Sequence, residues 1–225
     1  MTILADSTWP DVAAAPPLLL VPVGSCEQHG PHLPLDTDTR IAVAVAEAFV
    51  ASTDLRAVVT PSIAIGASGE HAGFPGTLSI GNAVLEALLT ELGRSADWSA
   101  GLVFVNGHGG NVTAVRAAVD TLVTEHRRAL AWWPNIRSGD AHAGRTETSL
   151  MLAIAPLLVR LDRFEIGNTE PIAALMPSLR SGGVIAVSGN GVLGDPTEAS
   201  AANGAALLAG LVEDLADSVQ AWLTR

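Results

Sequence analysis

LLLVPVGSCEQH, residues 18–29, joins a run of apolar residues to a cluster of polar ones, and this junction indicates the architecture of the chain. The run from Leu18 to Val23 is typical of a strand buried on both faces of a parallel sheet, and it ends at Gly24. Similar apolar runs predict strands at residues 57–65, 102–105, 129–133 and 184–187. Amphipathic stretches predict helices at residues 39–51, 82–98, 111–128, 147–155 and 199–223.

The alternation of strands and helices predicts a three-layer α/β/α fold with a mostly parallel central sheet. We expect residues 1–225 to form a single domain, with an irregular excursion in the Pro- and Gly-rich region 171–196. Ligands of such sheets bind beyond the carboxyl ends of the strands. Because polar clusters follow the first four expected strands, we expect one active site built from four loops.

The composition excludes several kinds of chemistry. All twelve basic residues are arginine and tyrosine is absent, so the chain lacks a P-loop lysine, a Schiff-base lysine and a phenolic acid. The single cysteine, Cys26, excludes an internal disulfide and every multi-cysteine metal site. Catalysis is left to six histidines, twenty-three carboxylates and the hydroxyl groups.

The charge and the apolar content limit the partners of the chain. A net charge of −11 disfavours nucleic acid, whose phosphates need clustered cations. The apolar runs are shorter than the roughly 20 residues of a membrane-spanning helix, and the first residues lack the basic region of a signal peptide. We therefore expect a cytoplasmic protein with no membrane partner. The hydrophobic content of 48% hints at buried interfaces in a homo-oligomer.

The first polar cluster contains a candidate metal site. Glu27 and His29 lie two residues apart, so their side chains share one face of an extended segment, and Asp38 follows after a Pro-rich loop. A carboxylate, an imidazole and a second carboxylate at a strand end suit a divalent cation. The alternative is a hydrogen-bonded loop in which His29 and Asp38 pair without a metal.

The other three loops add further candidate side chains. His108 follows the third expected strand, Glu70 and His71 follow the second, and His142 and Glu147 follow the fourth. The alternative role for His108 is that of a structural loop or helix-capping histidine. The alternative for Glu147 is that of an acid favoured by the helix dipole. Five of the six histidines fall in these four loops, which indicates a metal site with two ions. Glu147 is then a ligand or base and His142 a proton shuttle, whereas Glu70 and His71 line the substrate side or orient ligands.

Four segments in combination, GSCEQHGPHLPLDTDT, GASGEHAGFPGTLSI, VFVNGHGGN and HAGRTETS, resemble the creatininase family of metal-dependent amidohydrolases. The resemblance implies an α/β fold with a binuclear metal centre at the strand ends, and assembly as a hexamer. It also implies that Glu27, Asp38 and His108 hold one ion. His29 then holds the other ion together with Asp38, which bridges the two.

The chain departs from creatininase at one position of this pattern. Creatininase has a glutamate two residues after the histidine that matches His108, and this chain has Gly110 there. The second ion therefore lacks a ligand, and Glu147 is our candidate to replace it. The departure also argues against creatinine as the substrate.

Other segments resemble one kind of peptidase within the family: LPLDTDTRIA, IGASGEHAGFPGTLSIG, GVLGDPT and residues 145–149. This resemblance implies release of a C-terminal Val-Tyr dipeptide from a modified precursor peptide during redox-cofactor maturation. The implied cofactors are two divalent ions, Fe(II) and/or Zn(II), and Mn(II) suits the same ligands. Arg40, Arg145 and Arg180 are candidate clamps for the substrate carboxylate, with surface ion pairs as the alternative.

Three other functions stay open at this point. The first alternative function is that of another amidohydrolase of the family, such as a deformylase or lactam hydrolase. The second is that of a cysteine hydrolase that uses Cys26, although the neighbouring Glu27 makes that thiol a weak nucleophile. A third alternative is a non-catalytic metal-binding scaffold subunit of a biosynthetic complex.

Overall fold

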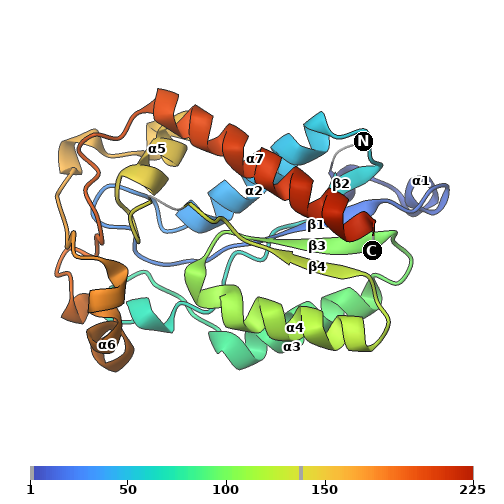
Figure 1. Ribbon diagram of the computed structural model, residues 1–225, viewed down its shortest axis with the longest axis horizontal. Coiled ribbons are helices and arrows are strands. Elements are labelled where there is room, and N and C mark those ends of the chain that lie inside the picture. Colours follow the sequence, from blue (N-terminus) through green and yellow to red (C-terminus); the bar gives the residue numbers. More distant parts are fainter. Residues whose placement is uncertain (1–2, 137–138, 225) are drawn as a thin grey trace.

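A computed structural model describes residues 3–136 and 139–224, in which a four-stranded sheet lies between two layers of helices (Figure 1). All three pairs of neighbouring strands are parallel, in the order β2-β1-β3-β4. The strands are β1 (Leu18–Val23), β2 (Ala57–Val59), β3 (Gly101–Asn106) and β4 (Ala129–Trp132). The expected three-layer α/β/α fold with a parallel central sheet is confirmed.

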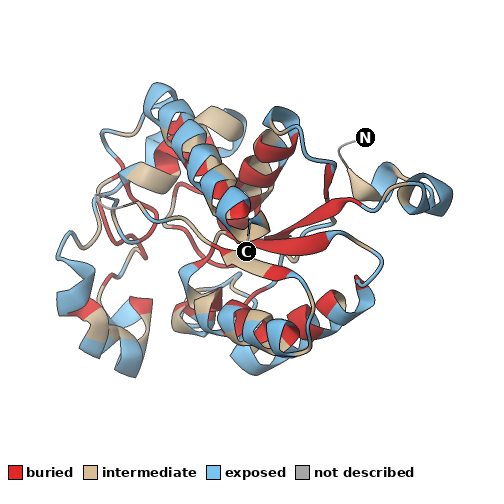
Figure 2. Cartoon of the chain, turned by 45° about the vertical axis from the view of Figure 1, so that its right-hand side comes forward, coloured by how far each residue is buried: buried red, intermediate tan, exposed pale blue. Residues whose placement is uncertain are grey.

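The alternating side chains of β1 divide the core into two parts. Leu18 and Leu20 pack with α2, α5 and α7, whereas Leu19 and Val21 pack with α3 and α4 on the other face. Burial on both faces explains why the strand has no polar residue. Figure 2 shows buried strands between helices whose outer faces are exposed. The helices are α2 (Thr37–Ser52), α3 (Gly81–Ser95), α4 (Val112–Thr124), α5 (Arg145–Ile154) and α7 (Ala201–Leu223).

Two strand predictions need correction. The strand expected at residues 57–65 ends at Val59, because Pro61 has no backbone N–H to donate to β1. Beyond this proline, the Ile63 amide donates a hydrogen bond to the carbonyl of Pro22 in β1 at 2.9 Å. The strand expected at residues 184–187 is instead the 3-10 helix η6 (Val184–Ala186).

The region 171–196 is not wholly irregular, because it contains the helix α6 (Ile172–Gly182). Pro177 lies inside this helix and removes one backbone donor, which hides the helix from sequence reasoning. The remaining short elements are η1 (Leu4–Asp6), α1 (Trp9–Ala13), η2 (Gly69–His71), η3 (Gly109–Asn111), η4 (Pro156–Leu158) and η5 (Leu161–Arg163). No helix of the described residues is long and apolar enough to cross a membrane.

Asn111 does not cap the helix that follows it; its side chain joins three loops at the carboxyl edge of the sheet. Its Oδ1 accepts a hydrogen bond from the Ala67 amide at 2.8 Å, and its Nδ2 donates to the Gly24 carbonyl at 2.9 Å and to Asn106 Oδ1 at 3.1 Å. These bonds hold the loops after β1, β2 and β3 together. Gly204 lets α7 pack closely on α5, since a Cβ there would overlap the carbonyl of Ser149, whereas a Cβ at Gly210 would meet no described atom within 4 Å.

Candidate metal centre

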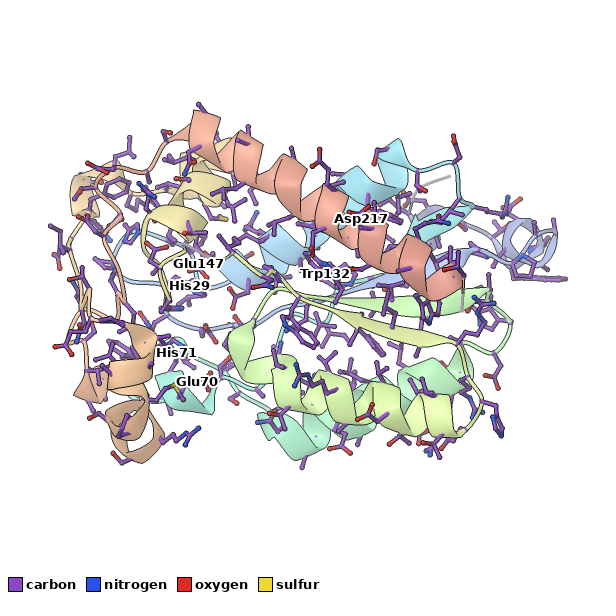
Figure 3. All side chains as sticks on the ribbon, in the orientation of Figure 1. His29, Glu70, His71, Trp132, Glu147 and Asp217 are labelled. Carbon is purple, nitrogen blue, oxygen red and sulfur yellow. The ribbon has the colours of Figure 1, made fainter. Side chains whose placement is uncertain are left out.

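All the predicted site residues lie at the carboxyl ends of the strands, where four loops meet (Figure 3). His29 and Glu147 gather there with Glu70 and His71, at the same end of the sheet as α6. The loop after β1 supplies Glu27 and His29, and the first turn of α2 supplies Asp38. Glu70 and His71 come from η2, and His108 comes from the turn after β3. The segment between β4 and the first turn of α5 supplies His142 and Glu147.

Asp38 is the buried centre of the cluster. Its Oδ1 lies 3.1 Å from Nε2 of His29 and its Oδ2 lies 3.1 Å from Nδ1 of His108, while the Ser25 hydroxyl donates to Oδ2 at 2.7 Å. Burial alone would raise the pKa of Asp38, but the two neighbouring imidazoles hold it well below its usual value. Burial would likewise lower the pKa of His29, but the Asp38 carboxylate raises it to about 10. The carboxylate of Asp38 therefore stays ionised between two histidines.

Glu27 is fully buried, with an imidazole beside each of its carboxylate oxygens. Nε2 of His71 lies 3.2 Å from Oε1, and Nε2 of His108 lies 3.1 Å from Oε2. Among the described residues, however, neither oxygen has a hydrogen bond of acceptable geometry. Burial, with the charge of Asp38, raises the pKa of Glu27 to about 7. A buried carboxylate without hydrogen bonds is costly unless it is paired or binds a cation, so this environment fits a metal ion.

The donor atoms form three overlapping triads, in each of which the atoms lie within 4.8 Å of one another. The triads are Glu27-His29-Asp38, Glu27-His71-His142 and His29-His142-Glu147. Carboxylate and imidazole together suit Zn(II), Mn(II) and Fe(II). The side chains thus fit one or more divalent ions, and His71 and His142 join the donor set that sequence reasoning had assigned to Glu27, His29, Asp38, His108 and Glu147.

Glu147 lies at the edge of this cluster, in the first turn of α5. Its Oε2 accepts a hydrogen bond from the Ala143 amide at 2.6 Å and lies 3.9 Å from Nε2 of His29. Burial raises the pKa of Glu147 to about 7. The hydrogen bond from Ala143 agrees with a structural role for Glu147 as an acid at the N-terminus of a helix. The short distance to His29 agrees with a role as a metal ligand. The two roles are compatible in one carboxylate.

Gly110 makes room for Glu70. A Cβ at Gly110 would overlap the carbonyl oxygen of Ala67, Nε2 of His108 and Oε1 of Glu70. Oε1 of Glu70 lies 3.5 Å from Nε2 of His108, close to the cluster. The Glu70 carboxylate therefore reaches the space beside Gly110, where the family resemblance implies a glutamate.

Gln28 is a site residue that sequence reasoning missed. Its Oε1 accepts a hydrogen bond from the Gly30 amide at 2.8 Å, which identifies its Nε2 as the donor. Nε2 lies 2.9 Å from Nδ1 of His71 and 3.0 Å from the Gly191 carbonyl, and the Gln28 carbonyl lies 2.9 Å from Nε2 of His142. Gln28 thus orients two histidines from different loops. Its place between two predicted ligands was the one signal in the sequence.

His32 and Cys26 lie outside the donor cluster. Nε2 of His32 lies 2.9 Å from the hydroxyl of Thr148, and burial lowers the pKa of His32 to about 4. His32 therefore ties its loop to α5. Sγ of Cys26 contacts the carbonyl of Gly76 at 3.7 Å, and no hydrogen bond among the described residues joins this thiol to a histidine.

A cavity of about 720 Å³ opens over the cluster. Asp38, His108 and Glu147 line it, and α6 contributes five further lining residues: Ile172, Met176, Leu179, Arg180 and Ser181. α6 packs against η2 and η6, so it stands apart from the two helical layers. The volume is within the range of pockets that hold small ligands.

Comparison with known proteins extends over nearly the whole chain. The family model described as creatinine amidohydrolase matches residues 5–219. The mycofactocin precursor peptide peptidase of Mycolicibacterium smegmatis is 57% identical over 225 residues, which cover 97% of this chain and 91% of that protein. The creatinine amidohydrolase of Pseudomonas putida is 30% identical, over 71% of this chain and 74% of that protein.

The fold agrees with these matches. A solved structure titled as the Mn form of creatininase superposes with a TM-score of 0.82 and 27% identity, and the match covers 97% of each chain. Since sequence and structure match over almost the full length, the chain belongs to the creatininase family and is a hydrolase of that family.

Proposed function

We propose that this protein is a metal-dependent peptidase that releases the C-terminal Val-Tyr dipeptide from the modified mycofactocin precursor peptide during redox-cofactor biosynthesis. The observation that carries the proposal is the 57% identity, over 97% of this chain, to a protein named for peptidase action on that precursor. The donor cluster and the cavity support it, because metal-assisted amide hydrolysis needs both ligands and space for a substrate.

The proposed cofactors are two divalent ions, Fe(II) and/or Zn(II), with Mn(II) as a further fit. Glu27, Asp38 and His108 would hold one ion. His29 and Glu147 would hold the other, and Asp38 would bridge them, which is supported by the approach of its two oxygens to His29 and His108. When bound, such ions polarise the scissile carbonyl and activate a water molecule.

The chain's own groups move the protons in this proposal. Burial holds the pKa of His142 well below its usual value, so the ring is neutral at pH 7. The Gln28 carbonyl engages Nε2 of His142, which leaves Nδ1 to face Oε1 of Glu27 at 4.0 Å. In the metal-free site Glu147 has a pKa of about 7, so it would exchange a proton near neutral pH as a base that is not bound to an ion. His142 and Glu147 would carry the proton to the leaving amine.

We propose roles outside proton transfer for Glu70 and His71. Both line the cavity, and His71 is held by Gln28 on one ring nitrogen and approaches Glu27 with the other. They would orient the ligands and the substrate.

We further propose a single domain over residues 1–225 that assembles as a cytoplasmic homo-oligomer, a hexamer as the family resemblance implies. Large exposed apolar side chains support assembly: Trp9 is 82% exposed, Leu157 92% and Leu161 63%.

The test is incubation of the protein with the modified precursor peptide and Fe(II) under anaerobic conditions, with products read by mass spectrometry. We expect the dipeptide and the shortened precursor, and we expect a chelator to abolish both. Intact precursor would contradict the peptidase function. Hydrolysis of a formamide or lactam instead would favour another amidohydrolase, and bound metal with no turnover of any of these compounds would favour a scaffold subunit.

A further inference from the structure

Four of the five residues that α6 contributes to the cavity lining share one face of the helix, and the fifth is Ser181. Ile172, Met176, Leu179 and Arg180 are spaced at i, i+4, i+7 and i+8, which places them on the same side of a helix. Three of these side chains are apolar and the fourth is a cation. The candidate metal ligands Asp38, His108 and Glu147 line the same cavity. A substrate in the cavity therefore meets both the metal centre and this helical face.

Of the residues that the structure describes, Arg180 is the one arginine in the lining of this cavity, and the chain has no lysine to act in its place. The two other candidate clamps are already paired: Arg40 contacts Asp36 at 2.8 Å, and Arg145 contacts Glu198 at 3.7 Å. Among the described residues, no carboxylate forms an ion pair with Arg180. Arg180 is exposed, and within the described part of the chain its permanent charge is left without an ion pair in a cavity that carboxylates also line.

A glycine keeps the end of α6 close to the site. Gly183 has a φ of 70°, and a Cβ there would lie 2.5 Å from the carbonyl oxygen of Glu70. The chain that leaves α6 therefore runs directly against η2, which carries Glu70 and His71. Because Arg180 lies in the last turn of α6, it is held at the η2 side of the cavity.

We propose that Arg180 binds the C-terminal carboxylate of the peptide substrate, and that Ile172, Met176 and Leu179 contact the side chains of the departing dipeptide. This inference rests on the peptidase function proposed above. An enzyme that removes two residues must recognise the chain end, and the terminal carboxylate is the group that marks it. Guanidinium groups bind carboxylates with two parallel hydrogen bonds. Two extended residues span about 7 Å, a length that a cavity of about 720 Å³ accommodates.

The test compares two precursor peptides, one with a free C-terminal carboxylate and one with a C-terminal amide, on the wild-type protein and on Arg180→Gln. We expect amidation to lower kcat/KM of the wild type by about 10- to 100-fold, the range of a charge-assisted hydrogen bond. Arg180→Gln should lose a similar factor on the free acid, mainly through KM, and should cleave the two peptides at equal rates. Arg180→Lys should recover part of the preference for the acid.

The matched control is Arg163→Gln, an exposed arginine outside the lining of this cavity, which should keep the wild-type preference. Equal cleavage of both peptides by the wild type, or a preference for the acid that survives in Arg180→Gln, would overturn the assignment.

A binding measurement separates this inference from the peptidase function. In calorimetry on the metal-loaded protein, Val-Tyr should bind about 10- to 100-fold more tightly than its amide, and Arg180→Gln should abolish that difference. If neither peptide is cleaved but this difference is present, the peptidase function fails and the carboxylate site stands. If both peptides are cleaved and the difference is absent, the carboxylate site fails alone.

Discussion

Proton release on metal binding is a sharp consequence of the buried groups at this centre. His29 has a pKa of about 10, and the Glu27 and Asp38 carboxylates outweigh burial and hold the pKa of His108 well above its usual value. Both histidines therefore carry a proton at pH 6 and at pH 8. Burial raises the pKa values of Glu27 and Glu147 to about 7, so these two groups are mostly protonated at pH 6 and mostly ionised at pH 8. A ligand must lose its proton to bind a cation.

The number of protons follows from these pKa values. At pH 8 the two histidines release about two protons and the two glutamates, each about one-tenth protonated, add about 0.2. At pH 6 each glutamate is about nine-tenths protonated, so the total rises to about 3.8 and the difference is about 1.6 protons. The metal-free site binds more protons than the metal-bound site. Metal affinity therefore falls as the pH falls, and it falls more steeply below pH 7 than above it.

The assay is calorimetric titration of Zn²⁺ into metal-free protein at each pH, in two buffers with different heats of ionisation. The matched variant is Glu147→Gln, which removes one group that titrates near pH 7 and should halve the difference to about 0.8 protons. Equal proton release at pH 6 and pH 8 would refute the reasoning. A difference that Glu147→Gln leaves unchanged would remove Glu147 from the ligand set.

Three further changes test other parts of the molecule. Asp38→Ala should lose both bound metal and hydrolysis, by metal analysis and peptide assay; a folded, active variant would disprove the bridging role. Trp132→Phe should lower the free energy of unfolding by about 1 kcal/mol, because Nε1 of Trp132 donates to Asp214 at 2.7 Å; an unchanged urea midpoint would contradict this. Cys26→Ser should keep chelator-sensitive hydrolysis, whereas activity that resists chelation and disappears in this variant would favour a thiol nucleophile.

The buried strands were predictable because burial on both faces leaves a continuous apolar run. Residues 18–23 and 102–105 have that pattern and form β1 and most of β3. Residues 184–187 have the same local pattern but pair with none of the four described strands, and residues 184–186 form η6. Hydrogen bonds to a partner strand are a long-range property that a short apolar run does not reveal.

The location of the site was predictable for a similar reason, since the carboxyl ends of parallel strands meet at one edge. Which histidines join the donor cluster and which have structural roles was not predictable. His29 and His32 are three residues apart, yet one joins the donor cluster and the other bonds Thr148. Gly30, with a φ of 65°, reverses the chain between them and sends the two rings to different places. A turn of this kind depends on packing from distant segments, here Val192, whose side chain would overlap a Cβ at Gly30.

The glycine at position 110 changes the shape of the site and not only its ligand count. A side chain at position 110 would overlap the carbonyl oxygen of Ala67. Because this oxygen belongs to the backbone, it cannot move aside as the end of a flexible side chain could. Glu70 fills part of the space and approaches His108, while Gly107, Gly109 and Gly110 all line the cavity without side chains. A smooth glycine wall lets a substrate backbone approach the donor cluster closely. Gly110 and the Glu70 carboxylate that approaches His108 thus shape this wall of the cavity together.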